Sequence, residues 1–465
     1  MGSVTLIPGV RDADSLRTMF STALSEMYKK EVPLYDELLS IVAKVDDQIA
    51  SGPLPARHRI ERHGAIRLGT AQEMQTIARL FALLNMHAVD YYDLSLVGFP
   101  LHATAFRPLT GEALSRNPFR VFTSLLRLDL LPAETSSLAQ QVLGKRKIFS
   151  DRLLELLDQA ETTGLTNSEQ EAELLEEALK IFKWHATAQT SYDFYKQLNS
   201  VHPMVADIAC FPSAHINHLT PRTLDIDQVQ EAMQIHGVPA KDRIEGPPRR
   251  RCDILLRQTS FQALEERVHF VDEDGNVTVS HHTARFGEVE QRGAAVTRKG
   301  RDLYDTLLEK ADSIIESKGT AGHGINDDWQ RALQEAFSEF PDTWAELRDQ
   351  RLVYFRYIPV TAPNAPLLEA EGQALKLSEL LDCGLIKYEA ITYEDFLPIS
   401  AAGIFTSNLK GFSNTKRKES KGNRSLLEQA LPTKILDSTA LYEQLEAESI
   451  ETCRKALGLL AIQSD

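Results

Sequence analysis

Cysteine is scarce in this sequence. The four cysteines lie far apart, at Cys210, Cys252, Cys383 and Cys453. This spacing contains no CxxC pair, which excludes zinc-ribbon and thioredoxin-like sites, and it offers no disulfide framework. We therefore expect reduced thiols in a cytoplasmic protein.

Long apolar runs and an excess of positive charge are also absent. No stretch approaches the roughly 18 apolar residues that a membrane helix needs, and residues 1–20 lack the apolar segment of a signal peptide. The net charge of −15 repels phosphate backbones and anionic lipids. No GxGxxG fingerprint follows a predicted strand, so a nicotinamide cofactor is not indicated. These absences argue against a nucleic-acid or membrane partner.

The order of predicted elements indicates an α+β protein built around one catalytic unit. The hydrophobic fraction of 43% and the charged fraction of 25% are ordinary for a globular chain. Apolar periodicity and turn residues predict two β-α-β-β-β modules with added helical layers. The predicted segments are N-terminal helices (1–54), the first module (55–135), a helical insertion (136–212), the second module (213–300), and helical and C-terminal additions (301–465).

Two predicted strands carry candidate ligands at alternating positions. In Glu61-Arg-His-Gly-Ala-Ile-Arg67, His63 and Arg67 lie four residues apart and share one face of a strand. In the stretch HINHLTPR, which begins at His215, parity places His218 on one face and His215 on the other. Only one of these two histidines can therefore face inward.

A third strand supplies carboxylates. The stretch FGEVEQRG, which begins at Phe286, carries Glu288 and Glu290 on the same face. A buried carboxylate is costly without a partner, and a metal ion would supply one. Two imidazoles and one carboxylate form the facial triad of non-haem iron enzymes, which leaves positions open for substrate and O2. Spacing alone does not select which histidines and which glutamate form it.

A family resemblance narrows the choice. The chain resembles, over nearly its full length, the 2-oxoadipate dioxygenase/decarboxylase (2-hydroxyglutarate synthase) family of the vicinal oxygen chelate superfamily. The superfamily has paired β-α-β-β-β modules, and the resemblance implies Fe(II) held by His63, His218 and Glu288. FGEVEQR is also similar to the ligand strand of 4-hydroxyphenylpyruvate dioxygenases, which favours Glu288 over Glu290. The blocks that carry the resemblance are ERHGAIRLGT, HATAFRP, NPFRVFTSLLRLDL, HINHLTPR, FGEVEQRG and EDFLPISAAGIF.

The resemblance also implies a reaction and a substrate site. Family members convert 2-oxoadipate and O2 into 2-hydroxyglutarate and CO2 in lysine degradation, and the 2-oxo acid brings its own electrons. Arg67 is the candidate to bind the remote carboxylate, because a guanidinium fork matches a carboxylate. The segment 398–403 resembles the family's substrate-side loop, which adds Ile399 and Ser400 as substrate-binding candidates.

Several alternatives stay open. The same ligand set suits zinc, so a metal-dependent hydrolase or lyase acting on a small organic acid is the competing function, and a non-catalytic regulator is a further one. His281 and His282 are rival ligands, although their place on a predicted hairpin favours solvent exposure. Arg67 could instead form a structural ion pair with Glu61 or another core carboxylate.

Overall fold

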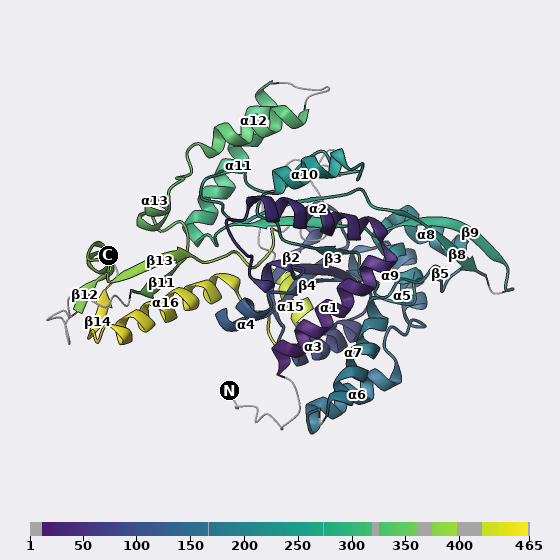
Figure 1. Cartoon of the computed structure of the whole chain (residues 1–465). Coiled ribbons are helices and arrows are strands. Elements are labelled where there is room, and N and C mark those ends of the chain that lie inside the picture. The colour runs from purple at the N-terminus through teal and green to yellow at the C-terminus, as the bar shows by residue number, and fades with distance from the viewer. Residues whose placement is uncertain are drawn as a thin grey trace. The chain divides into compact units, whose positions relative to one another are not determined.

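The computed structural model describes residues 12–165, 167–272, 274–318, 325–360, 374–397 and 421–463. The chain divides into two compact units, and Figure 1 labels helices and strands of both. Unit 1 contains residues 1–245, 258–291 and 395–436, and unit 2 contains residues 246–257, 292–394 and 437–465. Helices and several sheets occur in both, which confirms the predicted α+β class.

The central sheet of unit 1 contains the first β-α-β-β-β module. Its strand order is β2-β3-β4-β1-β6, with β1 parallel to β4 and antiparallel to β6. The stretch Thr70-Ala-Gln-Glu73 has the form of a capping box and predicts the start of a helix. Thr70 does cap the module's helix by accepting a hydrogen bond from the backbone N–H of Glu73, while the Glu73 side chain accepts from the backbone N–H of Gly69. The module's elements are β1 (His63–Leu68), α3 (Ala71–Leu83), β2 (His87–Asp93), β3 (Leu101–Arg107), α4 (Gly111–Arg116) and β4 (Arg120–Leu126).

One strand of this module differs from its predicted position. Residues 91–97 are rich in apolar side chains, which predicts a strand there, whereas β2 ends at Asp93 and a 3-10 turn, η2 (Leu94–Val97), follows. The Asp93 side chain accepts a hydrogen bond from the backbone N–H of Ser95, and Gly98 ends the turn with a φ of 87°. A capping side chain and a left-handed glycine thus stop the strand early.

The second module repeats the strand–helix opening but divides its strands between sheets. Strand β6 (His218–Thr220) joins the central sheet, β10 pairs with β7, and the hairpin β8–β9 pairs with β5 (Thr187–Ala188). The hairpin arms are half exposed along their length, so they form an extension of the module instead of its core. The remaining elements are α10 (Ile226–Ile235), β7 (Leu256–Ser260), β8 (Glu265–Val271), β9 (Val277–Thr283) and β10 (Glu288–Arg292).

Helices cover the sheet of unit 1 and hold the strands that carry the candidate ligands. Helix α1 (Ala13–Glu31) packs against α2 (Pro33–Ile49), and α2 packs against α10. The Tyr28 hydroxyl on α1 donates to the carbonyls of Asn217 (3.0 Å) and Phe286 (2.7 Å), just before β6 and β10. The other helices of unit 1 are α5 (Ala133–Leu143), α6 (Asp151–Thr162), α7 (Ser168–Phe182), α8 (Tyr192–Val201), α9 (Pro203–Cys210) and α15 (Lys421–Gln429).

Unit 2 contains most of the chain after residue 300, together with residues 246–257 and 292–300, while residues 395–436 belong to unit 1. Strands β11 and β13 pair antiparallel, and β12 pairs parallel with β14. Of all the helices in the described ranges, none combines the length and the apolar character that crossing a membrane requires. The elements of unit 2 are α11 (Arg298–Lys318), α12 (Ile325–Phe337), α13 (Trp344–Asp349), β11 (Phe355–Pro359), β12 (Ala374–Lys376), α14 (Leu377–Asp382), β13 (Ile386–Ala390), α16 (Ser438–Ala456) and β14 (Ala461–Gln463).

Candidate metal centre

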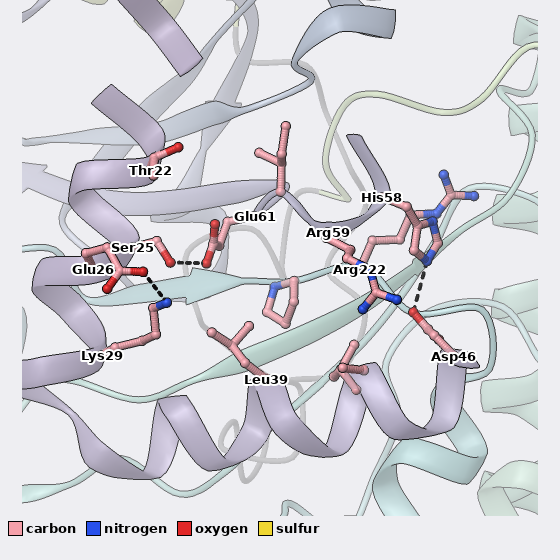
Figure 2. Close-up of a pocket in the computed structure, with 14 residues that line it drawn as sticks. Thr22, Ser25, Glu26, Lys29, Leu39, Asp46, His58, Arg59, Glu61 and Arg222 are labelled. Atoms are coloured by element: carbon pink, nitrogen blue, oxygen red, sulfur yellow. Dashed lines mark hydrogen bonds and ion pairs between the residues drawn. The ribbon is translucent and has the colours of Figure 1, made fainter. Parts of the chain in front are cut away.

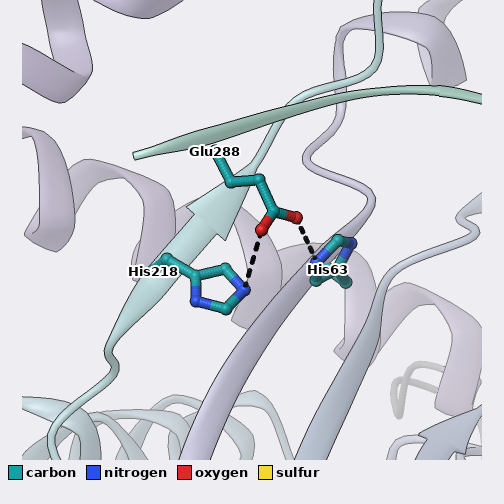
Figure 3. Close-up of side chains that lie close together, drawn as sticks. All are labelled: His63, His218 and Glu288. Atoms are coloured by element: carbon teal, nitrogen blue, oxygen red, sulfur yellow. Dashed lines mark ion pairs between the residues drawn. The ribbon is translucent and has the colours of Figure 1, made fainter. Parts of the chain in front are cut away.

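The side chains of His63, His218 and Glu288 converge in unit 1 from three strands (Figure 3). The register of β1 and β6 sets His63 opposite Thr220 and Ala65 opposite His218, so the two histidines share one face of the sheet. Glu288 is the first residue of β10, and its carboxylate points toward both imidazoles. All three side chains are fully buried, and their ligand atoms lie within 4.8 Å of one another.

The hydrogen bonds of this cluster are incomplete in a way that suits a metal ion. His63 Nε2 lies 3.0 Å from Glu288 Oε1, but His218 Nε2 lies 4.0 Å from Glu288 Oε2, which is too far for a hydrogen bond. Among the described residues, no hydrogen-bond partner is found for either nitrogen of His218 or for Glu288 Oε2. Buried polar atoms are rarely left in this state. Ligand atoms about 2.1 Å from one ion lie about 3.0 to 3.4 Å apart at octahedral or tetrahedral angles, and the ligand atoms of this cluster, all within 4.8 Å of one another, are close to that spacing.

The other Glu288 oxygen is held by neutral donors. Oε1 accepts hydrogen bonds from Gln258 Nε2 at 2.5 Å and from Thr220 Oγ1 at 3.2 Å. Thr220 Oγ1 also lies 3.1 Å from His63 Nε2. These contacts fix the carboxylate without neutralising its charge, and that charge remains for a cation.

Glu290 lies on the far side of the His63 ring. Its Oε2 is 2.9 Å from His63 Nδ1, and its Oε1 is 3.6 Å from Arg62 Nε. The contact is an ion pair and not a well-aligned hydrogen bond, and a carboxylate beside one imidazole nitrogen orients the ring and leaves the other nitrogen to bind a metal. Because Nε2 faces Glu288, Glu290 occupies the supporting position, and the choice of Glu288 over Glu290 as the ligand stays a prediction.

Aromatic rings enclose the two imidazoles and keep them in a low-dielectric environment. Phe286 stacks on His218 with centroids 4.6 Å apart, and Phe396 meets His63 edge-on at 4.8 Å. Burial, reinforced by the nearby charge of His63, holds the pKa of His218 well below its usual range. A neutral imidazole with a free lone pair is the form that binds a metal.

Arg67 lies on the same face of β1 as His63 but is already paired. Its Nη1 donates to Asp207 Oδ2 at 2.7 Å, and both side chains are buried. The predicted alternative of an ion pair with a core carboxylate is therefore present, although the partner is Asp207 and not Glu61. The other two substrate-binding candidates, Ile399 and Ser400, lie outside the described residues.

Glu61 belongs to a different feature. It hydrogen-bonds to Ser25 beside a cavity of about 300 Å³ between α1, α2 and the segment before β1 (Figure 2). No residue of the metal cluster lines this cavity. Burial raises the pKa of the Glu61 carboxyl, and Glu61 is not the partner of Arg67.

The expectation of solvent exposure is right for His281 and wrong for His282. His281 is exposed, whereas His282 is 4% exposed and lies in a second cluster with Asp207 and His215. The side chains of β9 alternate, so one histidine of the pair must face the protein, and the helical insertion covers that face with Tyr195. Sequence reasoning missed Asp207 and Gln258 altogether, because neither belongs to a recognisable motif.

Comparison with known proteins gives one consistent result. The family model for 2-oxoadipate dioxygenase/decarboxylase matches residues 20–408. A 2-oxoadipate dioxygenase/decarboxylase of Pseudomonas putida is 47% identical over 458 residues, covering 96% of this chain and 97% of the relative. One of Escherichia coli is 46% identical, covering 95% and 98%. The crystal structure of the Pseudomonas putida hydroxyglutarate synthase in complex with 2-oxoadipate matches with a TM-score of 0.86 and 46% identity, covering 97% of this chain and 99% of that one.

Proposed function

Because the chain belongs to the 2-oxoadipate dioxygenase/decarboxylase family, we propose that it converts 2-oxoadipate and O2 into 2-hydroxyglutarate and CO2 in the cytoplasm. In this proposal Fe(II) is the metal, and His63, His218 and Glu288 hold it. The reaction is balanced without a further reductant, since the six-carbon 2-oxo diacid loses one carbon as CO2 and both oxygen atoms of O2 enter the products.

The observation that carries the proposal is the set of buried ligand atoms that lack partners. Two neutral imidazoles and one carboxylate would leave a divalent ion with residual positive charge, which favours an anionic 2-oxo acid. Bound iron would supply the one-electron chemistry by which O2 can react with that acid. Glu290 keeps His63 oriented from behind, and Phe286 and Phe396 keep bulk water away from the ligands.

Arg67 is the residue that we assign to the remote carboxylate of the substrate. Only its Nη1 is engaged within the described part of the chain, so Nε and Nη2 remain able to donate to a second carboxylate. Four residues of strand span about 13 Å, so the long side chain must lean toward His63 to meet a six-carbon diacid. Ile399 and Ser400 complete the proposed site from the segment that resembles the family's substrate loop.

The experiment measures O2 consumption and 2-hydroxyglutarate formation with 2-oxoadipate, using protein reconstituted with Fe(II) and, separately, with Zn(II). We expect equal amounts of O2 consumed and product formed with iron and neither with zinc. His63→Ala should abolish both, while His236→Ala, a change at an exposed histidine, should not. Fully loaded iron protein that consumes no O2 would refute the proposal and favour a metal-dependent hydrolase or lyase.

A further inference from the structure

Arg67 is held at one edge by a carboxylate that comes from the helical insertion. Asp207 lies on α9, and its Oδ2 accepts from Arg67 Nη1 at 2.7 Å. The two side chains are 5% and 9% exposed, so the pair is shielded from solvent. An arginine side chain has many rotamers, and a charge-assisted bond at one nitrogen restricts where the remaining donors can point.

Asp207 is itself fixed from its other side. Its Oδ1 lies 2.8 Å from His282 Nε2 and 3.2 Å from His215 Nε2. When neutral His282 donates from Nε2, its Nδ1 accepts from the Tyr195 hydroxyl, which lies 3.0 Å away. Both oxygens of Asp207 are therefore engaged, and the carboxylate cannot rotate without breaking contacts to three side chains.

Aromatic rings hold the two histidines in place. Trp184 stacks on His282 with an interplanar angle of 7° and meets His215 edge-on at 4.8 Å. Phe211 packs against His282 with centroids 4.7 Å apart. Burial raises the pKa of Asp207, but the attraction of His215 and Arg67 outweighs it and holds that pKa well below its usual range. The cluster is thus a rigid, anionic support for one guanidinium.

The same cluster has the composition of a second metal site, since Asp207, His215 and His282 lie close enough to share an ion. Its contacts argue against that use. Asp207 already pairs with a guanidinium, and both nitrogens of His282 are engaged. A divalent cation bound to Asp207 would lie beside the positive charge of Arg67, which is unfavourable in a buried site.

We propose that Asp207, fixed by His282 and His215, is a positioning residue that aims the free Nε and Nη2 donors of Arg67 at the remote carboxylate of the substrate. The cluster thereby sets the preference for a diacid over a 2-oxo acid that lacks the second carboxylate. This inference rests on the proposed function, in which Arg67 binds that carboxylate.

The test compares two ligands of the same carbon number, 2-oxoadipate and 2-oxohexanoate, which lacks the remote carboxylate. Dissociation constants are measured by calorimetry without O2 on Fe(II)-loaded protein, and metal content and melting temperature are recorded for each variant. We expect Asp207→Asn to weaken 2-oxoadipate on the order of tenfold and to leave 2-oxohexanoate within about twofold. Asp207→Asn on an Arg67→Ala background should cause no further loss, because the two residues act as a unit.

Controls separate positioning from general damage. Asp46→Asn changes another buried carboxylate that contacts a histidine, His58, at 2.9 Å, and it should lower the melting temperature without altering the ratio of the two dissociation constants. Tyr195→Phe removes only the outermost hydrogen bond of the cluster, so it should shift the ratio in the same direction by about two- to threefold. This variant keeps the test decisive if Asp207→Asn does not fold.

Three results would overturn the inference in distinguishable ways. If Arg67→Ala is selective for the diacid but Asp207→Asn and Tyr195→Phe are not, positioning fails while the proposed role of Arg67 stands. If Arg67→Ala weakens both ligands equally, the proposed role of Arg67 fails and the inference fails with it. If Asp207→Asn loses one equivalent of bound metal, the cluster is a metal site instead.

Discussion

The contact between Glu290 and His63 gives a quantitative prediction about metal affinity. Glu290 Oε2 lies 2.9 Å from His63 Nδ1, and both side chains are fully buried. Glu290→Gln keeps the size of the side chain and an oxygen that can accept from Nδ1, but it removes the charge that makes His63 a stronger ligand. Loss of such a supporting carboxylate typically costs 10- to 100-fold in metal affinity, or about 1.4 to 2.7 kcal/mol.

The assay is a calorimetric titration of metal-free protein with Zn(II) in the presence of a competing chelator, repeated with Co(II) to follow the ligand set by absorption. Glu266→Gln is the matched control, because Glu266 is a carboxylate paired with an arginine, Arg285, and belongs to neither group of potential metal ligands. The dissociation constant of the Glu266→Gln variant for the metal should stay within about twofold of that of the unmodified protein. The arginine partner of Glu290 is Arg62, so a melting curve for each variant separates loss of metal affinity from loss of folding.

Two results would refute this reasoning. An unchanged metal affinity in Glu290→Gln would mean that the buried carboxylate does not tune His63. Complete loss of binding in Glu290→Gln, with binding retained in Glu288→Gln, would mean that Glu290 is the ligand and Glu288 the supporting group.

The remaining predictions concern metal stoichiometry, pH and a buried ion pair. The protein should bind one equivalent of divalent metal, and His218→Ala should reduce the bound metal below about 0.2 equivalent by elemental analysis. Free metal at about 100 times the dissociation constant should add about 2.7 kcal/mol to the free energy of unfolding of the unmodified protein. Burial, aided by Arg127, lowers the pKa of His102 to about 4, so the unfolded chain takes up a proton on this residue at a higher pH than the folded protein does. Stability should therefore fall as the pH drops from about 6.5 toward 4, by up to about 3 kcal/mol from this residue, and denaturant titrations of His102→Gln should show a shallower fall; an equal fall would contradict the assignment. Asp395 holds the buried Arg107 through bonds of 2.6 and 3.0 Å, so Asp395→Asn should destabilise the fold by about 3 to 5 kcal/mol in denaturant titrations, and a loss below about 1 kcal/mol would show that the pair is not buried in solution.

The first module could be predicted because its signals are local. The N-cap at Thr70 fixes where α3 begins. Strand β1, just before it, is a short run that is buried at every position, as expected for a strand in the core of a sheet. The second module was predicted less completely, since the hairpin β8–β9 pairs with β5, a strand of two residues far back in the insertion. A strand of two residues is too short to show a periodic pattern, so the sequence could not predict that β5 pairs with β8.

The ion pair between Arg107 and Asp395 could not be predicted either, because it also joins distant parts of the sequence. Arg107 lies in the block HATAFRP and its partner Asp395 in the block EDFLPISAAGIF, 288 residues apart. Each block carries the resemblance, yet neither indicates that the other is its partner. Ion pairs between residues far apart in the sequence depend on how the chain folds. The alternation of polar and apolar residues along one strand does not predict them.

The two histidine–carboxylate clusters show that residue types alone do not identify a metal site. Each offers two histidines and one acid, and the sequence could not rank them beyond the family resemblance. Each cluster contains one histidine, His215 or His218, whose nitrogens have no hydrogen-bond partner among the described residues. The carboxylates differ: Asp207 is paired with Arg67 and His282, whereas Glu288 Oε2 has no hydrogen-bond partner among the described residues. Since a buried carboxylate oxygen without a partner is costly, the cluster of His63, His218 and Glu288 is the one that a cation would complete. Two clusters of the same residue types therefore have different proposed roles. In these proposals the cluster with Glu288 binds the metal, and the cluster with Asp207 positions Arg67, which binds the substrate.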